Sequence, residues 1–396
     1  MTTRLLAPAG EPSQGDRGAH SRAVVVLAFG ACAIGVCELA AIGVLGLVGE
    51  DLRSSVGATG YIVTAYAVGV CLGGPLLAIT TARWDRRNVL VAALGAFVVA
   101  NLATAVAPGL ALILVLRLVT GSLHGLYIGL ATSCAAALAV PHRRGDAVAM
   151  VFGGVAVATV LGAPLGSLLG AAFGWRAAFW AVAAVAAVAL LGVARVVPSV
   201  TGDAAGGAIG ALRAAMSLRV VAFLSLIVLV MGGVFSFYTY VTEFVEHRTG
   251  LTGTAMSGLL LAFGLASAVG TIVGGRLADR SAGLAMAVAA GTTTAALGAL
   301  AAVGDSPLAA TICLIACGLA AFSYIPPFQL RLMSLAAPAT DLAATLGASA
   351  ANAGIALGAA VGGAALTRGT DSLVAVACAL CAVGLTATLL ASRIRP

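Results

Sequence analysis

Twelve long apolar runs, separated by short polar breaks, dominate this chain. The hydrocarbon core of a membrane is about 30 Å thick, and a helix needs about 20 apolar residues to cross it. Read at that length, the runs fall at 23–48, 58–81, 89–107, 110–137, 147–172, 177–197, 219–244, 253–278, 284–303, 308–331, 340–366 and 371–392. We therefore expect an all-α membrane protein with twelve transmembrane helices.

The scarcity of charge supports a lipid environment. Only 9% of the 396 residues are charged, whereas a water-soluble domain has about a quarter. The chain has no lysine, which excludes the lysine-bearing phosphate loop of an ATP-driven pump. Its basic residues also form no polar cluster with interleaved aromatics, as a nucleic-acid binder would have. The four histidines are not paired at metal spacing. We expect no metal, no cofactor, no nucleic-acid partner and no enzymatic activity.

The eight cysteines all fall inside apolar runs. One pair, Cys378 and Cys381, has the spacing of a redox motif but lacks the flanking strand and helix pattern of such a site. We interpret all eight as small hydrophobic residues that fill contacts between helices.

The arginines predict the orientation of the chain. Cytoplasmic segments of membrane proteins are enriched in basic residues. If the N-terminus is cytoplasmic, sixteen of the 21 arginines lie on the cytoplasmic side and four on the outside, with Arg117 inside a span. We expect a multi-pass protein of the cytoplasmic (inner) membrane with both termini in the cytoplasm. The polar residues 1–22 are predicted to be a disordered cytoplasmic tail.

The chain divides into two similar halves. Its longest internal polar break, residues 198–218, is predicted to be a cytoplasmic linker between six-helix bundles at 23–197 and 219–396. The Gly73-Gly74 pair at the end of the second span has a counterpart in Gly274-Gly275 at the end of the eighth. Glycines at four-residue spacing also recur in the fifth and eleventh spans, at Gly162, Gly166, Gly170 and at Gly354, Gly358, Gly362. Such repeats are common in secondary transporters, whose substrate site lies between the halves.

Several motifs resemble those of the major facilitator superfamily. The segment from Gly74 through Arg83, Asp85, Arg86 and Arg87 is similar to the signature loop that follows the second helix of that family. Arg117 with Gly121 and Gly125 resembles its fourth-helix motif. The run Gly162-Ala163-Pro164-Leu165-Gly166 is similar to the antiporter signature of the fifth helix. The first helix around Glu38 resembles the drug:proton antiporters grouped with chloramphenicol and arabinose efflux. The resemblance implies two pseudo-symmetric six-helix bundles.

Three residues are candidates for proton coupling. Glu38 is the only acid well inside a span, and an ionised carboxylate at that depth costs about 2.5–3.5 kcal/mol on insertion scales. We predict that Glu38 carries the proton; the alternative is a structural carboxylate. Arg117 stays charged and is predicted to act on Glu38, unless it only binds helix carbonyls. His124, two turns after Arg117, is a candidate relay, although a histidine bonded to a carbonyl is the more ordinary explanation.

Candidate substrate contacts come from the few polar and aromatic side chains in the spans. Drug-like ligands bind in mostly apolar pockets with a few fixed polar groups. The residues predicted to contact substrate are Tyr66, Asn101, Phe237, Tyr238, Gln329 and Asn352. Aromatic residues near a helix end also serve as membrane-interface anchors, which is the alternative explanation.

Gating is assigned to the basic loops and to the proline and glycine positions of the fifth span. Proline removes a backbone hydrogen bond, and glycines let neighbouring helices approach. The predicted gating residues are Gly74, Arg83, Asp85, Arg86, Arg87, Gly162, Pro164, Gly166, Arg276, Asp279 and Arg280. Positive-inside topology alone also accounts for the arginines.

Together the sequence predicts a monomeric, proton-coupled exporter of a small hydrophobic or amphipathic compound, such as an antibiotic. The partners expected are a small-molecule substrate, protons and the lipid bilayer. Two alternatives stay open: an exporter of sugars, nucleosides or amino-acid metabolites, and a membrane sensor without transport.

Overall fold

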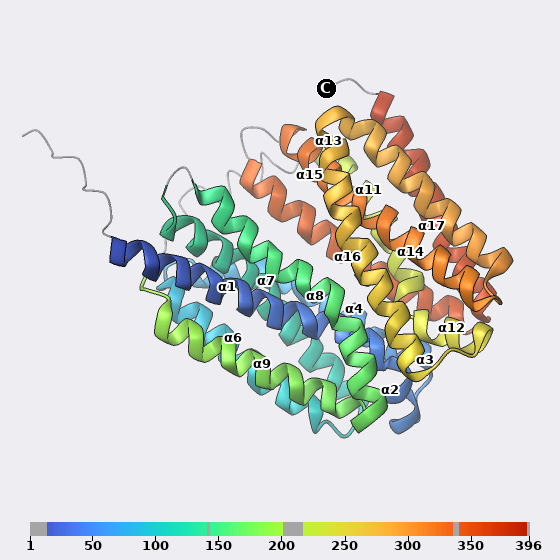
Figure 1. Cartoon of the computed structure of the whole chain (residues 1–396), viewed down its shortest axis with the longest axis horizontal. Helices are drawn as coiled ribbons and strands as arrows, with labels where there is room; N and C mark the ends of the chain where they lie inside the picture. The colour runs from blue at the N-terminus through green and yellow to red at the C-terminus, as the bar shows by residue number, and fades with distance from the viewer. Residues whose placement is uncertain (1–13, 141–142, 201–216, 336–339, 394–396) are drawn as a thin grey trace, which may run out of the picture.

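The computed structural model describes residues 14–140, 143–200, 217–335 and 340–393, and these form helices joined by short loops (Figure 1). The first half of the chain, up to Val200, contributes α1 (Gln14–Ala40), a 3-10 turn (Ile42–Val44), α2 (Leu45–Asp51), α3 (Val56–Thr59), α4 (Tyr61–Val68), a π-helical turn (Gly69–Gly73), α5 (Gly74–Thr81), α6 (Arg86–Ala105), α7 (Leu110–Leu138), α8 (Arg144–Phe173) and α9 (Trp175–Val196). The second half contributes α11 (Leu218–Tyr238), α12 (Val241–Thr249), α13 (Gly253–Val303), α14 (Pro307–Ser323), α15 (Ile325–Leu335), α16 (Thr340–Leu366) and α17 (Thr370–Arg393).

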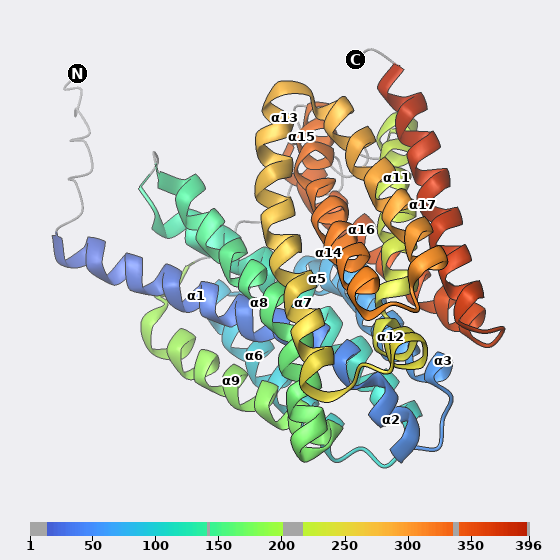
Figure 2. The same cartoon turned by 45° about the vertical axis from the view of Figure 1, so that its right-hand side comes forward.

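The expected twelve crossings are present. Eleven continuous helical stretches in the described residues are long and apolar enough to span a membrane. One of them, α13, has 51 residues and contains a non-helical residue at Ser281. At 1.5 Å per residue a straight helix of that length would far exceed the bilayer. Figure 2 shows the chain reversing direction there, so α13 supplies two crossings, and the prediction of twelve transmembrane helices in two bundles is confirmed.

Some helix ends differ from the predicted ranges. Helix α1 begins at Gln14, inside the stretch predicted to be a tail, and residues 1–13 lie outside the described part. Most of the predicted linker, residues 201–216, also lies outside it. The first, seventh and tenth spans are each broken into two helices, because the chain leaves regular α geometry at 41–44, 239–240 and 324.

Glycines set the close helix contacts in both halves. A side chain on Gly166 of α8 would lie 2.3 Å from the Ala40 carbonyl oxygen of α1. Correspondingly, a side chain on Gly362 of α16 would lie 2.1 Å from the Ser236 carbonyl oxygen of α11. Small residues allow backbones to approach in this way inside membranes. The two glycine stripes thus perform the same packing in each half.

The paired glycines at the ends of the second and eighth spans also have matching contacts. A side chain on Gly74 of α5 would lie 2.7 Å from the Cα of Gly125 in α7. One on Gly274 of α13 would lie 2.2 Å from the Ser323 carbonyl oxygen in α14. The repeat expected from the sequence therefore appears as equivalent packing in two bundles.

The two halves meet at one end of the molecule. We call the end where α1 begins and α17 ends the terminal end, and the end holding α2, α3 and α12 the far end. Figure 2 shows the two halves diverging from the far end toward the terminal end. The Ser257 hydroxyl of α13 donates to the Ser167 hydroxyl of α8 at 3.0 Å, and Thr64 of α4 donates to the Ala356 carbonyl of α16 at 3.4 Å. The halves are thus joined toward the far end.

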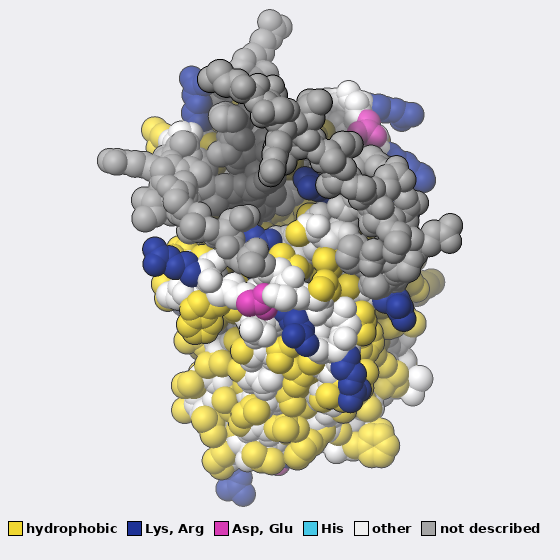
Figure 3. Space-filling view, turned by 90° about the vertical axis from the view of Figure 1, so that its left-hand side faces the viewer, with side chains coloured by type: hydrophobic (Ala, Val, Ile, Leu, Met, Phe, Trp, Pro, Cys, Tyr) yellow, Lys and Arg dark blue, Asp and Glu magenta, His cyan; other side chains and the backbone are white. Residues whose placement is uncertain are grey.

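The surface fits a membrane environment. On the face shown in Figure 3, hydrophobic side chains dominate toward the lower edge, and basic side chains lie mainly near the grey segments above. Large hydrophobic residues such as Leu72, Val99 and Leu308 are each at least 66% exposed. A soluble protein would have to hide much of this surface, whereas lipid solvates it.

Candidate functional site

The predicted coupling residues converge inside the first half. Glu38 lies near the end of α1, Tyr66 on α4, and Arg117 and His124 on one face of α7. Nδ1 of His124 lies 3.5 Å from Oε2 of Glu38 and 2.9 Å from the Tyr66 hydroxyl. Tyr66 also donates to the Ile34 carbonyl at 3.3 Å. The carboxylate, imidazole and phenol therefore form one contiguous polar chain among three helices.

Arg117 ties α7 to two other helices. Its Nε donates to the Ile62 carbonyl of α4 at 3.2 Å, and one terminal nitrogen donates to the Cys37 carbonyl of α1 at 3.1 Å. The guanidinium also lies over the Tyr66 ring, with 4.0 Å to the ring centroid. The residue is 1% exposed, and its other terminal nitrogen has no hydrogen-bond partner among the described residues. Arg117 thus binds helix carbonyls, as the ordinary alternative expects, and an action of Arg117 on Glu38 stays a prediction.

Cys37 belongs to this cluster, which the sequence reading missed. Its sulfur accepts from Arg117 at 3.2 Å and donates to Oδ1 of Asn101 at 3.1 Å. Nδ2 of Asn101 in turn donates to the Phe97 carbonyl at 2.8 Å. Cys37 is therefore more than a small apolar filler. The adjacent Glu38 was the signal that could have singled it out. Asn101, proposed as a substrate contact, is 1% exposed and lies in this network.

An aromatic cluster occupies the second half. Tyr238 of α11 stacks on Phe263 of α13, with ring centroids 4.1 Å apart and planes 17° apart. Phe235 and Phe322 make edge contacts with these two rings. The Tyr238 side chain is buried, and its hydroxyl makes no hydrogen bond within the described residues. Phe263 was not predicted, because nothing in the sequence of its span distinguishes it from a packing residue.

The other predicted substrate contacts are dispersed. Phe237 packs edge-on against Phe244 in the core of the second half, at 5.1 Å between ring centroids. Gln329 lies on α15 against Gly347 of α16. Nδ2 of Asn352 donates at 3.1 Å to a carbonyl of its own helix, while its buried Oδ1 has no partner among the described residues. These three residues stay predictions as substrate contacts.

The predicted gating loop of the first half is bound to the end of α9. Asp85 caps α6 by accepting from the Asn88 backbone at 3.0 Å, and it also accepts from the Ser199 hydroxyl. Arg87 donates to the Ala194 carbonyl, and the Arg86 backbone donates to the Val200 carbonyl at 3.0 Å. The Ser199 hydroxyl, together with backbone N–H groups, lowers the pKa of Asp85. These contacts hold the loop within its own half.

The remaining gating candidates fall into two groups. Gly162 and Pro164 are buried on α8, beside the contact with α1 that Gly166 makes. The second group lies at the terminal end of the molecule. It consists of Arg276, Asp279 and Arg280, directly before the turn of α13 at Ser281, and Arg83, which precedes α6. A role for any of them in gating stays a prediction. In the described residues, no group of three or more His, Cys, Asp or Glu side chains is placed to hold a metal ion.

The family follows from comparison with known proteins. The sequence profile of the Major Facilitator Superfamily matches residues 27–363. This chain belongs to that superfamily. The inner membrane transport protein YdhP of Escherichia coli K12 is 30% identical over 346 residues, covering 87% of this chain and 89% of YdhP. The Streptomyces lividans chloramphenicol resistance protein is 32% identical over 352 residues, covering 88% and 90%.

Solved structures confirm the fold of this superfamily member. The crystal structure of a D-xylose-proton symporter matches with a TM-score of 0.77 at 15% identity, covering 95% of this chain and 98% of the symporter. The crystal structure of a mutant of the nucleoside transporter NupG gives a TM-score of 0.76 at 12% identity, covering 94% of this chain and 99% of that transporter. At such identities the likeness concerns the two-bundle architecture alone.

Proposed function

We propose that this chain is a proton-coupled antiporter that exports a small hydrophobic or amphipathic compound, such as an antibiotic, across the cytoplasmic membrane. It works as a monomer by alternating access, with both termini cytoplasmic, and catalyses no covalent chemistry. The observation that carries the proposal is the contact of Glu38 with His124 inside the first half. Ionisable groups within membrane spans are expensive and mark ion and proton pathways.

Each polar residue of this cluster has a distinct part. Glu38 binds and releases the proton, and its side chain keeps 18% of its surface exposed, so that water reaches it. His124 and Tyr66 are hydrogen-bonded to each other and offer the proton a path beside the carboxylate. Arg117 keeps its charge throughout, because a guanidinium does not lose its proton in a protein. It supplies a fixed positive field that favours the ionised form of Glu38 once the proton has left.

The substrate class is inferred from the second half and from one relative. The stacked rings of Tyr238 and Phe263 present flat apolar surface with a single free hydroxyl. Such surfaces suit compounds that are mostly apolar and carry a few polar groups. The relative from Streptomyces lividans is named a chloramphenicol resistance protein, which agrees with export of an antibiotic.

Alternating access is supported by the difference between the two ends. The halves make hydrogen bonds and close backbone contacts toward the far end, at Ser167 with Ser257 and at Gly57 with Gly363. Within each half, helices are locked together by glycine packing, so each half is suited to move as a unit. In the expected orientation, this conformation is closed to the outside.

The test is efflux in a bacterial host that lacks its own exporters. Dye efflux and antibiotic resistance are measured for wild type, Glu38→Gln and Asp146→Asn, at matched membrane expression, with and without a protonophore. Asp146 is the control, because it is an exposed carboxylate paired with Arg143 on the surface. We expect wild type and Asp146→Asn to extrude in a protonophore-sensitive manner, and Glu38→Gln to lose extrusion. Undiminished extrusion by Glu38→Gln would assign Glu38 a structural role, and protonophore-insensitive extrusion would remove proton coupling.

A further inference from the structure

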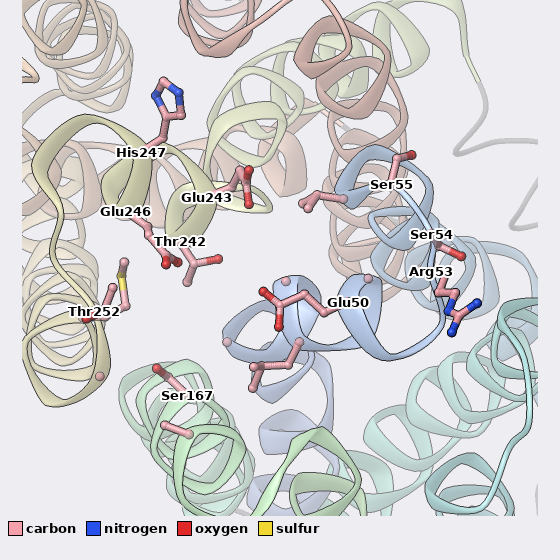
Figure 4. A pocket seen from close by; sticks show the side chains of 18 residues that line it. Glu50, Arg53, Ser54, Ser55, Ser167, Thr242, Glu243, Glu246, His247 and Thr252 are labelled. Atoms are coloured by element: carbon pink, nitrogen blue, oxygen red, sulfur yellow. The ribbon is translucent and has the colours of Figure 1, made fainter.

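The far end contains a cavity of about 730 Å³ between the two halves. Its walls come from the end of α2 and the start of α3 in the first half, and from α12 and the start of α13 in the second. Residues of α8, among them Ser167, close its inner side (Figure 4). The cavity therefore lies on the seam that must open if the far end is to open.

Three carboxylates face one another across this seam. Glu50 comes from the first half, whereas Glu243 and Glu246 come from α12 in the second half. Figure 4 shows these three side chains directed toward the open centre, while the imidazole of His247 and the guanidinium of Arg53 point away from it. The cavity is thus lined with negative charge from both sides and lacks an inward-facing cation among the described residues.

The other charged groups nearby are engaged elsewhere. Asp51, next to Glu50, is paired with Arg176 at 2.5 Å and accepts from the indole of Trp175. Arg248 on α12 pairs with Asp305 at 2.9 Å and with Asp371 at 3.4 Å. The residues that α8 and α13 contribute to the cavity wall are uncharged. Within the described part of the chain, the three carboxylates therefore have little positive charge to offset them.

Closing the seam makes ionisation of Glu243 less favourable. Burial, then the neighbouring carboxylates of Glu246 and Glu50, raise the pKa of Glu243 above its usual value, with His247 opposing. Opening the seam would separate Glu50 from α12 and admit water, so burial and the repulsion from Glu50 would weaken, whereas the repulsion from Glu246 on the same helix would stay. A conformation that binds a proton more tightly is favoured as the pH falls. The closed far end is such a conformation.

We propose that protonation of the carboxylates in this cavity holds the far end closed, and that their ionisation drives the two halves apart there. The device is separate from the proton site at Glu38, because it acts on the seam between the halves rather than inside one of them. In the expected orientation, an acidic exterior closes the far end and favours return of the carrier to the inward-facing state. The pH of the outside medium then sets how long the exporter stays open to it.

The experiment measures the far-end separation as a function of pH. Spin labels are introduced by noncanonical amino acids at Val106 on the first half and Val303 on the second, both exposed and outside the cavity. Label-to-label distances are measured by pulsed electron resonance on the full chain in lipid nanodiscs, from pH 4.5 to 8.5. For wild type we expect a longer-distance population to grow with pH, by up to about tenfold per pH unit between the ordinary glutamate pKa of about 4.3 and the raised pKa of Glu243 in the closed state, and to level off above it.

Neutral isosteres provide the decisive comparison. Glu243→Gln should stay closed and lose at least half of the pH response. Glu50→Gln, which removes only the last of the causes that raise the pKa of Glu243, should lose a smaller part of it. Asp146→Asn, which changes an exposed carboxylate of α8 outside the cavity, should behave as wild type. Two Glu variants on different halves guard against a folding defect in either one. A wild-type distance that does not change with pH, or a response that survives in both Gln variants, overturns the proposal. Because no substrate is needed, neither outcome depends on whether the chain exports anything or on the role of Glu38.

Discussion

Among the glycines described at the contact between the halves, Gly60 leaves the least room for a side chain, and adding one methyl group there should open the far end. Gly60 lies between α3 and α4 and faces Tyr240, which lies between α11 and α12. The Tyr240 hydroxyl donates to the Ala359 carbonyl of α16 at 2.7 Å, and the residue is buried. A Cβ on Gly60 would lie 1.7 Å from that hydroxyl oxygen and 2.4 Å from the adjacent ring carbon. In Gly60→Ala the closed seam therefore has to give way.

The cost falls on the closed state alone. Gly60 has φ −57° and ψ −25°, which alanine adopts without strain. Overpacking of this kind costs about 1–3 kcal/mol. A buried hydroxyl that loses its partner adds about 1–3 kcal/mol. Even the lower sum, about 2 kcal/mol, shifts the ratio of closed to open far ends about 30-fold, since each 1.4 kcal/mol is a factor of ten.

The labels at Val106 and Val303 report this shift directly. Gly60→Ala at low pH, where wild type is closed, should show mainly the longer distance. Gly46→Ala is the matched control, because Gly46 also lines the far-end cavity but a Cβ there meets no atom within 4 Å. Thermal unfolding confirms that both variants are folded. If Gly60→Ala keeps the wild-type distance, or Gly46→Ala opens equally, the steric reasoning is refuted.

Three further predictions concern single residues that make contacts within one half. Cys37→Ser keeps a group that can hydrogen-bond to Arg117 and should retain protonophore-sensitive efflux. Cys37→Leu should lose this efflux at equal expression. Equal efflux by the two variants would make Cys37 a packing residue. Gly166→Val should lower the thermal unfolding temperature markedly, because its side chain would meet the α1 backbone. Gly153→Val is the control and should not lower it, because a Cβ there meets nothing within 4 Å. Similar unfolding temperatures for the two variants would contradict this prediction. Asp85 has a lowered pKa in the folded state, so its stabilising effect is present above the ordinary aspartate pKa of about 3.9 and is lost as the pH falls through the lowered value. Asp85→Asn should therefore reduce the acid dependence of unfolding measured by circular dichroism, by a small amount because the site is exposed; an unchanged acid profile would count against it.

The fold was predictable because bilayer thickness and backbone hydrogen bonding leave few choices for a chain this apolar. The length of the apolar runs predicts the spans, and the glycine spacing predicts the repeat. The sequence did not predict the breaks in the first, seventh and tenth spans. Their residues are as apolar as those around them, and the breaks depend on contacts with other helices. Tyr240, for example, lies where α11 ends, against Gly60 of the other half.

That polar side chains meet inside the first half was partly predictable for a related reason. A lone acid and a lone arginine are conspicuous in an apolar helix, so Glu38, Arg117 and His124 could be named from sequence. Cys37 and Phe263 resemble ordinary packing residues, and their importance lies in which side chain faces them across a helix contact. The far-end carboxylates lie at or beyond the ends of the predicted spans, where single acids are common, and only the structure places Glu50 opposite Glu243.

The energy of the contacts that hold the far-end seam closed can be compared with the energy that one proton supplies when it crosses the membrane. One proton crossing about 100 mV supplies about 2.3 kcal/mol, and one pH unit adds about 1.4 kcal/mol. In the proposed antiport of one proton per substrate, this total of about 3.7 kcal/mol would have to both open and close the carrier in each cycle, and for a neutral substrate it would sustain a gradient of a few hundredfold. A seam much stronger than this would trap the closed state. Across the seam, the described residues form the Ser167–Ser257 and Thr64–Ala356 hydrogen bonds, and these are accompanied by close helix packing such as that of Gly57 against Gly363. Membrane hydrogen bonds contribute about 0.6 kcal/mol each on average, so both bonds together stay well below the energy that one proton supplies. Hydrogen bonding across the seam therefore does not by itself prevent the control by carboxylate protonation that we propose.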